Sequence, residues 1–224
     1  MTEKASAKKT TVKKVSSALK NGTFTVSGKG KMPESAMPKA AQKKKIKKIV
    51  IKNGVTELPE DAFRDCSKAT VITIAPTVSR IGAMAFYNTG VEKITIPKKA
   101  GNLGYGMLQN CKNLKELTIP GNFWAREPKK AVNKKNLIGS LILGNDNSNI
   151  VKKVKFSTDF VWQCQETLGD CEEFEVLETD PYYKSIDGCI YSKDGKRLEA
   201  VPYGRKEIDI ACLLYTSDAA DDRI

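Results

Sequence analysis

The segments "VEKITIP" (residues 91–97) and "LKELTIP" (residues 114–120) spell nearly the same seven residues 23 positions apart. Two earlier segments, "IKKIVI" (residues 46–51) and "ATVITI" (residues 69–74), carry the same pattern. In all four the first, fourth and sixth residues are apolar, and alternation over the last three is typical of a strand with one buried side. The sequence therefore predicts short strands that recur every 22 or 23 residues.

A period of 20–29 residues with an L-x-x-L-x-L core is the signature of leucine-rich repeats, in which each coil supplies one strand. A single coil cannot cover its apolar face, so several must stack. We therefore expect residues 46–211 to form a mainly β repeat solenoid. Its coils of about 23 residues would place a parallel sheet on one face and short turns or irregular segments on the other. The recurring pairs Ala62-Phe63 and Ala85-Phe86 are expected to fill the opposite, convex side.

The repeat is irregular between residues 121 and 158. "IGSLIL" (residues 138–143) and "VKKVKF" (residues 151–156) start only 13 positions apart. Either one coil is shortened, or the two segments pair as a hairpin around "GNDNSN" (residues 144–149), which is rich in turn residues. We expect the register to return at "TLGDC" (residues 167–171), with Cys171 in the place of Cys66 and Cys111. A hairpin-like segment is expected at residues 180–206, with a turn at Asp194-Gly195.

Three motifs, in order, resemble the BspA-type bacterial leucine-rich repeat family. "ITIAPTVSRIGAMAFYNTGVEKITIP" (residues 72–97) follows the repeat unit of that family, with Thr89 in the place of a cysteine. "GTFTVSGKGKMP" (residues 22–33) resembles its strand-rich lead-in, and "DPYYKSIDGCIYSKDGKRLEAVPYGRK" (residues 180–206) resembles a further segment. The resemblance covers about residues 22–211. It implies a cell-surface or secreted protein of the adhesin or matrix-binding kind, found in anaerobic gut and oral bacteria and some protists.

The two ends differ from the repeats. We expect residues 1–21 to be a basic, disordered leader and residues 22–45 to be lead-in strands and a linker. The N-terminus lacks the apolar stretch of a signal peptide, so the protein would be cytoplasmic if Met1 is its true start. No run approaches the roughly 18 apolar residues of a membrane span. Residues 212–224 are expected to be non-native, because "CLLYTSDAADD" resembles translated sequencing-adapter DNA; the natural protein would then continue beyond Ala211.

Composition limits the possible chemistry. The full sequence contains no histidine, which excludes Ser-His-Asp and Cys-His nucleophiles and histidine metal sites. Apart from Cys212, its cysteines show no C-x-x-C pair, and we interpret them as structural thiols. We therefore predict that the protein is not an enzyme and has no catalytic residue, metal or cofactor.

The candidate binding residues are those between the inward positions, because they would line the outer face of the sheet. They are Lys48, Val50, Lys52, Val71, Thr73, Lys93, Thr95, Glu116, Thr118, Lys153, Lys155, Val176 and Glu178. Solenoids bind extended partners on such faces, so the main hypothesis is a binding scaffold that recognises a protein or glycan, such as an acidic protein or a sulfated glycan. The same residues could instead be an ordinary soluble β-surface.

Two further hypotheses stay open. The net charge of +12 comes from residues 1–52, which hold 15 Lys and 2 Glu, while the remaining residues sum to −1. An intracellular scaffold could use this segment to bind nucleic acid or another polyanion. "QKKKIKK" (residues 42–48) has no aromatic neighbours for base stacking, which disfavours nucleic acid. Alternatively, the repeats could only space another domain.

Overall fold

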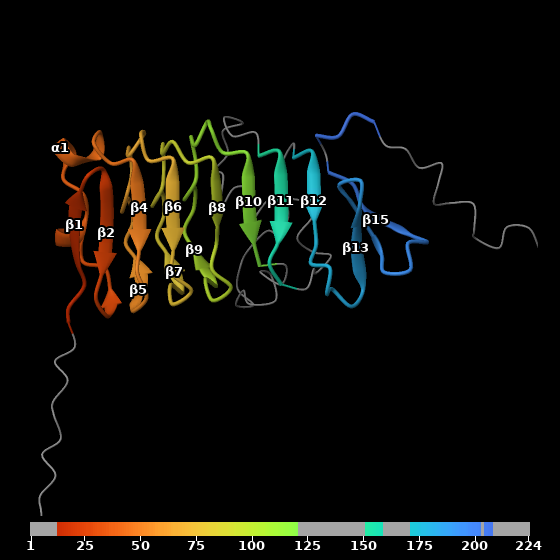
Figure 1. Cartoon of the computed structure of the whole chain (residues 1–224), viewed down its shortest axis with the longest axis horizontal. Coiled ribbons are helices and arrows are strands. Elements are labelled where there is room, and N and C mark those ends of the chain that lie inside the picture. The colour runs from red at the N-terminus through yellow and green to blue at the C-terminus, as the bar shows by residue number, and fades with distance from the viewer. Residues whose placement is uncertain (1–12, 121–150, 159–170, 203, 208–224) are drawn as a thin grey trace, which may run out of the picture.

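The main sheet contains one strand from each coil. The computed structural model describes residues 13–120, 151–158, 171–202 and 204–207, and its strands stand side by side in one elongated row (Figure 1). Eight strands form this sheet in the order β1-β2-β4-β6-β8-β10-β11-β12. Their bounds are Ser16–Lys20, Thr23–Ser27, Lys48–Ile51, Val71–Ile74, Lys93–Thr95, Glu116–Ile119, Lys153–Phe156 and Glu173–Glu175. From β2 onward all neighbours are parallel, so the predicted solenoid is confirmed.

A second, shorter sheet lies on the other side of the coils. It consists of the parallel strands β3 (Gly30–Lys31), β5 (Val55–Leu58), β7 (Arg80–Ile81) and β9 (Asn102–Leu103). The 3-10 turn η1 (Glu34–Ala36) and the one-turn helix α1 (Ala40–Lys43) lead from β3 to β4. The sequence predicts only turns or irregular segments here, so this side is more regular than expected.

Aromatic rings form the centre of the core. Phe63 and Phe86, the second members of the recurring Ala-Phe pairs, are fully buried and stack with centroids 5.6 Å apart. Phe24 of β2 meets Phe63 edge-on at 5.9 Å. Both pairs are buried, and the rings join consecutive coils to one another; that they fill the convex side stays a prediction.

The N-terminal segment differs from the expected leader. β1 lies inside residues 1–21 and pairs antiparallel with β2, so that Lys20 lies opposite Thr23. A tight turn joins the two strands, with φ of 48° at Asn21 and 76° at Gly22, as in a type I′ hairpin. The prediction that residues 16–20 are disordered is therefore wrong. In this hairpin their backbone groups find hydrogen-bond partners on β2. Residues 1–12 lie outside the described part.

The pairing of β11 tests both alternatives for the irregular region. β11 pairs in parallel with β10 on one edge and with β12 on the other. A strand has only two ladder edges, so β11 cannot also be one arm of a hairpin in this sheet. The hairpin reading is therefore wrong. The shortened coil is also wrong, because β10 and β11 are direct neighbours in the sheet and Glu116 lies opposite Lys153, 37 residues further along the chain. "IGSLIL" and the expected turn lie within residues 121–150, outside the described ranges.

The register at β12 also differs from the prediction. Phe174 lies opposite Val154, the buried central residue of β11. This places Cys171 at the first inward position, where "LKELTI" has Leu114, and not in the place of Cys111. The coil between β11 and β12 advances by 20 residues, against 23 between β8 and β10. The sequence-based alignment of "TLGDC" with "MLQNC" placed this strand three residues too late, and so the shorter coil was missed.

A three-stranded antiparallel sheet follows the last coil. It contains β13 (Tyr183–Ile186), β14 (Cys189–Ser192) and β15 (Leu198–Ala200). The β14–β15 connection turns at Asp194-Gly195, where the amide of Gly195 bonds the carbonyl of Ser192 at 2.8 Å. The turn between β13 and β14 presents the carbonyl of Gly188 to the amide of Phe174 at 2.8 Å. This sheet therefore closes the β12 end of the main sheet.

Candidate binding face

The outward side chains of the main sheet form two rows, because consecutive parallel strands are in register. The first row, from β2 to β12, is Thr23, Lys48, Val71, Lys93, Glu116, Lys153 and Glu173. The second is Thr25, Val50, Thr73, Thr95, Thr118, Lys155 and Glu175. Strands in a sheet are about 4.8 Å apart, so each row presents closely and regularly spaced groups to a partner.

Predicted face residues on β4, β6, β8, β10 and β11 all lie on these rows. They are Lys48, Val50, Val71, Thr73, Lys93, Thr95, Glu116, Thr118, Lys153 and Lys155. Lys52 is exposed and directly follows β4. Their geometric placement is as expected; their role in binding stays a prediction.

Two predicted residues near β12 are not on the rows. Val176 is 6% exposed and belongs to the core, and Glu178 is exposed but lies beyond the strand. The reason is the three-residue shortening of this coil, which moves Glu173 and Glu175 onto the face instead. Aligning "CEEFEV" (residues 171–176) directly with "VKKVKF" would have found both glutamates, because their apolar residues match at the first, fourth and sixth positions.

Opposite charges on β8, β10, β11 and β12 are paired with one another. We call this group the ion-pair ladder: Lys93, Glu116, Lys153, Lys155, Glu173 and Glu175. Lys93 lies 3.0 Å and Lys155 3.5 Å from carboxylate oxygens of Glu116. Lys153 lies 2.8 Å from Glu175 and 3.1 Å from Glu173, and Lys155 also reaches Glu175 at 3.5 Å.

The ladder shifts the titration of its members. The hydrogen bond from Lys153 lowers the pKa of Glu175 below its usual range, and the hydrogen bond to Glu175 raises the pKa of Lys153. Partial burial alone would raise the pKa of Glu116, but the hydrogen bond from Lys93 and the charge of Lys155 outweigh it, so this pKa is lowered. This half of the face is therefore electrostatically satisfied by its own residues.

The other half of the face carries no acid. Strands β1, β2, β4 and β6 contain no Asp or Glu. Lys48 and Lys52 form no ion pair with any residue of the described part. Val71, between Lys48 and Lys93 in its row, is 47% exposed although apolar. A partner that approaches this half encounters lysines without an acidic partner among the described residues, threonine hydroxyls and an exposed apolar side chain.

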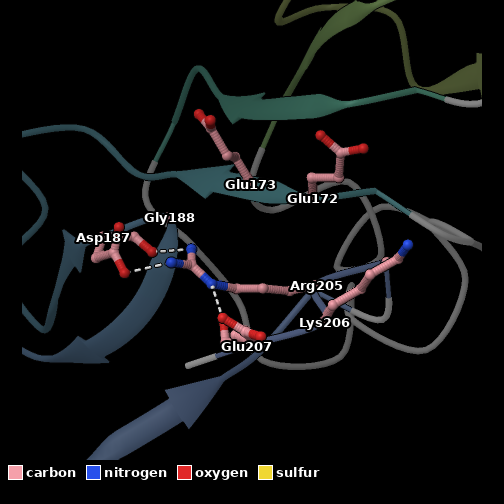
Figure 2. A pocket seen from close by; sticks show the side chains of 8 residues that line it. Glu172, Glu173, Asp187, Gly188, Arg205, Lys206 and Glu207 are labelled. Atoms are coloured by element: carbon pink, nitrogen blue, oxygen red, sulfur yellow. Dashed lines mark hydrogen bonds and ion pairs between the residues drawn. The ribbon is translucent and has the colours of Figure 1, made fainter. Parts of the chain in front are cut away.

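A hollow of about 600 Å³ lies where the C-terminal segment meets β12 (Figure 2). Arg205 fills part of it, bonding the carboxylate and carbonyl of Asp187, and its Nε bonds the carbonyl of Glu207 at 2.9 Å. The hollow's acidic residues Glu172 and Glu173 are paired with lysines on the neighbouring coil. The contacts of Arg205 with Asp187 hold the C-terminal segment against the β13–β14 turn, and the amide of Gly204 bonds the carbonyl of Cys171 at 3.0 Å, so we interpret this hollow as structural.

The described cysteines are buried free thiols: Cys66, Cys111, Cys171 and Cys189. Burial raises the pKa of Cys66 to about 12, and burial also raises the pKa of Cys111 despite its contact with the Thr89 hydroxyl at 3.2 Å. Neutral buried thiols are poor nucleophiles and metal ligands. Cys164 lies outside the described ranges. In residues 13–120, 151–158, 171–202 and 204–207, no group of three acidic, cysteine or histidine side chains is placed to hold a metal ion.

Residues 37–160 match the family described as BspA type Leucine rich repeat region, in six copies. The match extends over more than half of the chain. The chain belongs to this BspA-type repeat family. Among curated protein sequences, none matches it. Across the described residues, no helix has the length and apolarity needed to cross a membrane.

Solved structures of other bacterial repeat proteins resemble these BspA-type coils. A leucine-rich repeat protein from Eubacterium ventriosum is 19% identical, with a TM-score of 0.49, and the match covers 88% of this chain and 50% of that one. The pneumococcal vaccine antigen PcpA is 14% identical, with a TM-score of 0.39 and coverages of 88% and 56%. A leucine-rich cell surface protein from Faecalibacterium prausnitzii is 14% identical, with a TM-score of 0.33 and coverages of 92% and 64%. The chain thus spans about half the length of the first two.

Proposed function

We propose that this chain is a non-enzymatic scaffold that binds a protein or glycan across the outer face of its main sheet, as part of a cell-surface or secreted protein. The observation that carries the proposal is the division of that face. Its β8–β12 half is neutralised by the ion-pair ladder, whereas its β2–β6 half carries lysines that pair with none of the described residues, beside an exposed valine. Family resemblance supports the location outside the cell.

Binding would work by shape and charge complementarity across several coils. The face is rigid, because every strand from β4 to β11 is hydrogen-bonded on both edges. A rigid face loses little conformational entropy on binding. The exposed side chain of Val71 would be buried, and so lose contact with water, when a partner binds. The hydroxyls of Thr73 and Thr95 can both donate and accept hydrogen bonds. Such a mixture suits extended proteins and carbohydrates alike.

The lack of histidine in the sequence and of accessible thiols among the described cysteines supports a binding scaffold over an enzyme. The sequence has no histidine, and the four described thiols are buried. The family is one of repeat scaffolds, and repeat solenoids present extended surfaces for partners.

The experiment compares face and control variants of the full chain on immobilised collagen, mucin and a glycan array. The face variant combines Val71→Gln and Thr73→Gln. The control combines Tyr105→Gln and Asn102→Gln, because Tyr105 is 41% exposed, much like Val71, but lies outside the main sheet. We expect the face variant to weaken binding at least tenfold and the control to change it less than twofold. Equal binding by both variants, or binding to none of these probes, would contradict the proposal.

A further inference from the structure

Four lysines gather at one corner of the main sheet, where the β1–β2 turn meets the start of β4. We call Lys20, Lys45, Lys47 and Lys48 the lysine corner. All four are exposed, and none forms an ion pair with a residue in the described ranges. In Figure 1 this corner lies beside α1, at the end of the molecule that carries the first strands.

Backbone hydrogen bonds hold the two lysine-bearing segments together. The carbonyl of Gly22 accepts from the amide of Lys47 at 2.7 Å and from that of Lys48 at 3.1 Å. A Cβ added at Gly22 would lie 3.4 Å from Cγ of Lys47, so the stem of that lysine lies over the turn. The corner is therefore a fixed feature of the fold and not part of an unstructured leader.

The spacing of the charges is set by the sheet. Lys20 lies opposite Thr23, and Thr23 lies opposite Lys48. Two strand spacings separate the lysine backbones, about 9–10 Å, and long flexible stems let their ammonium groups approach a common ligand. The ligand must therefore carry several closely spaced negative charges.

We infer that the lysine corner binds a sulfated polysaccharide. This inference rests on the proposed function, since it names the partner for one part of the same face. Each ammonium offers three hydrogen-bond donors to sulfate oxygens, and the adjoining Thr23, Thr25 and Thr73 hydroxyls can bond sugar hydroxyls. A polysaccharide with sulfates on successive sugars supplies the dense negative charge that suits four lysines with no acidic partner in the described part of the chain.

The composition of the corner disfavours nucleic acid. Single-stranded nucleic acids are held by bases stacked on aromatic rings, whereas the only aromatic residue on β1, β2 and β4 is Phe24, which is 1% exposed.

The test measures binding of the full chain to immobilised heparin, with hyaluronan and duplex DNA as comparison probes. The corner variant combines Lys20→Gln, Lys45→Gln, Lys47→Gln and Lys48→Gln. The control combines Lys68→Gln, Lys99→Gln, Lys112→Gln and Lys196→Gln, which are exposed, lie outside the main sheet and remove the same charge. Both keep the first 12 residues, and thermal unfolding verifies that both are folded.

We expect the corner variant to bind heparin at least tenfold more weakly than the wild type, and the control less than threefold more weakly. The slope of log affinity against log salt concentration should become shallower by about 3 in the corner variant, because its four missing lysines no longer neutralise charges of the polyanion. Hyaluronan, which carries carboxylates without sulfate, should bind at least tenfold more weakly than heparin. Equal losses in the two variants would overturn the inference, as would tighter binding of duplex DNA than heparin. Neither outcome would affect the collagen, mucin and glycan test with the Val71 and Thr73 variant, so the two proposals fail separately.

Discussion

The ring of Phe86 lies parallel to the ring of Phe63, with 5° between their planes and 5.6 Å between their centroids. The two residues belong to consecutive coils, and both are fully buried. Each strand face alone is too small to hold a coil in place, so contacts of this kind between neighbours supply the stability of a solenoid.

Truncating this stack should therefore be costly. We expect Phe86→Ala to lower the free energy of unfolding by about 3–5 kcal/mol, since it removes a large buried ring and leaves a cavity. Phe86→Leu should cost about 1.5 kcal/mol, because it keeps most of the volume. Urea denaturation measures both. A loss below 1 kcal/mol for Phe86→Ala would show that the coils do not depend on this contact.

Val176 and Glu178 test the register at β12. Val176→Lys should lower the free energy of unfolding by about 3 kcal/mol or more, because it puts an unpaired charge in the core. Glu178→Lys, at an exposed position, should change it by less than about 0.5 kcal/mol. If both substitutions are tolerated equally, Val176 faces outward and the sequence-based register is right.

The repeated strands could be predicted because their inward residues follow a fixed pattern with a fixed interval. Phe174 shows where this reasoning fails: the coil before it is three residues shorter, and a cysteine that looked equivalent to Cys111 suggested the wrong alignment. The second sheet was missed for a different reason. Strands such as Arg80–Ile81 have two residues and arise from backbone hydrogen bonds between coils, which leave no side-chain pattern.

The candidate face was largely predictable, but its division was not. Alternation placed Lys153 and Lys155 on the outer side correctly. Which charges meet depends on the register of neighbouring strands, and the misplaced β12 hid Glu173 and Glu175, the partners of these lysines. That Lys48 has no acidic partner among the described residues likewise follows only from knowing that β2 and β6, which contain no Asp or Glu, are the neighbours of its strand.

The ion-pair ladder should make stability depend on pH. The folded pKa of Glu175 is lowered, so its contribution is present above the ordinary glutamate pKa of about 4.3 and is lost as pH falls through the folded value. Because the pair is solvent-accessible, Glu175→Gln should cost only about 0.5 kcal/mol at pH 7 and low salt. The difference from wild type should vanish at pH 2 and shrink in 1 M NaCl. Denaturation curves at the two pH values check this; a difference that persists at pH 2 would argue against the pairing.

Buried thiols should react slowly in the folded protein. The raised pKa of Cys66, about 12, keeps it protonated at pH 8, so a thiol reagent should label it at least a hundredfold faster in 8 M urea than in buffer. Since the unfolded thiol ionises near pH 8.5, this group should make folding less stable as pH rises above that value. Peptide mapping by mass spectrometry identifies the labelled site. Rapid labelling of Cys66 in buffer would contradict its burial.

The most direct test of the central claim is a lysine-reactivity footprint of the full chain with whichever collagen, mucin or glycan probe it binds. Acetylation with and without the probe, quantified by mass spectrometry, reports which lysines the partner covers. We predict at least threefold protection of Lys48 and Lys52, which lie on or beside the main-sheet face, and no change at Lys68 and Lys112, which lie outside it. Protection of Lys68 and Lys112 with Lys48 and Lys52 unchanged would show that the partner binds elsewhere on the solenoid.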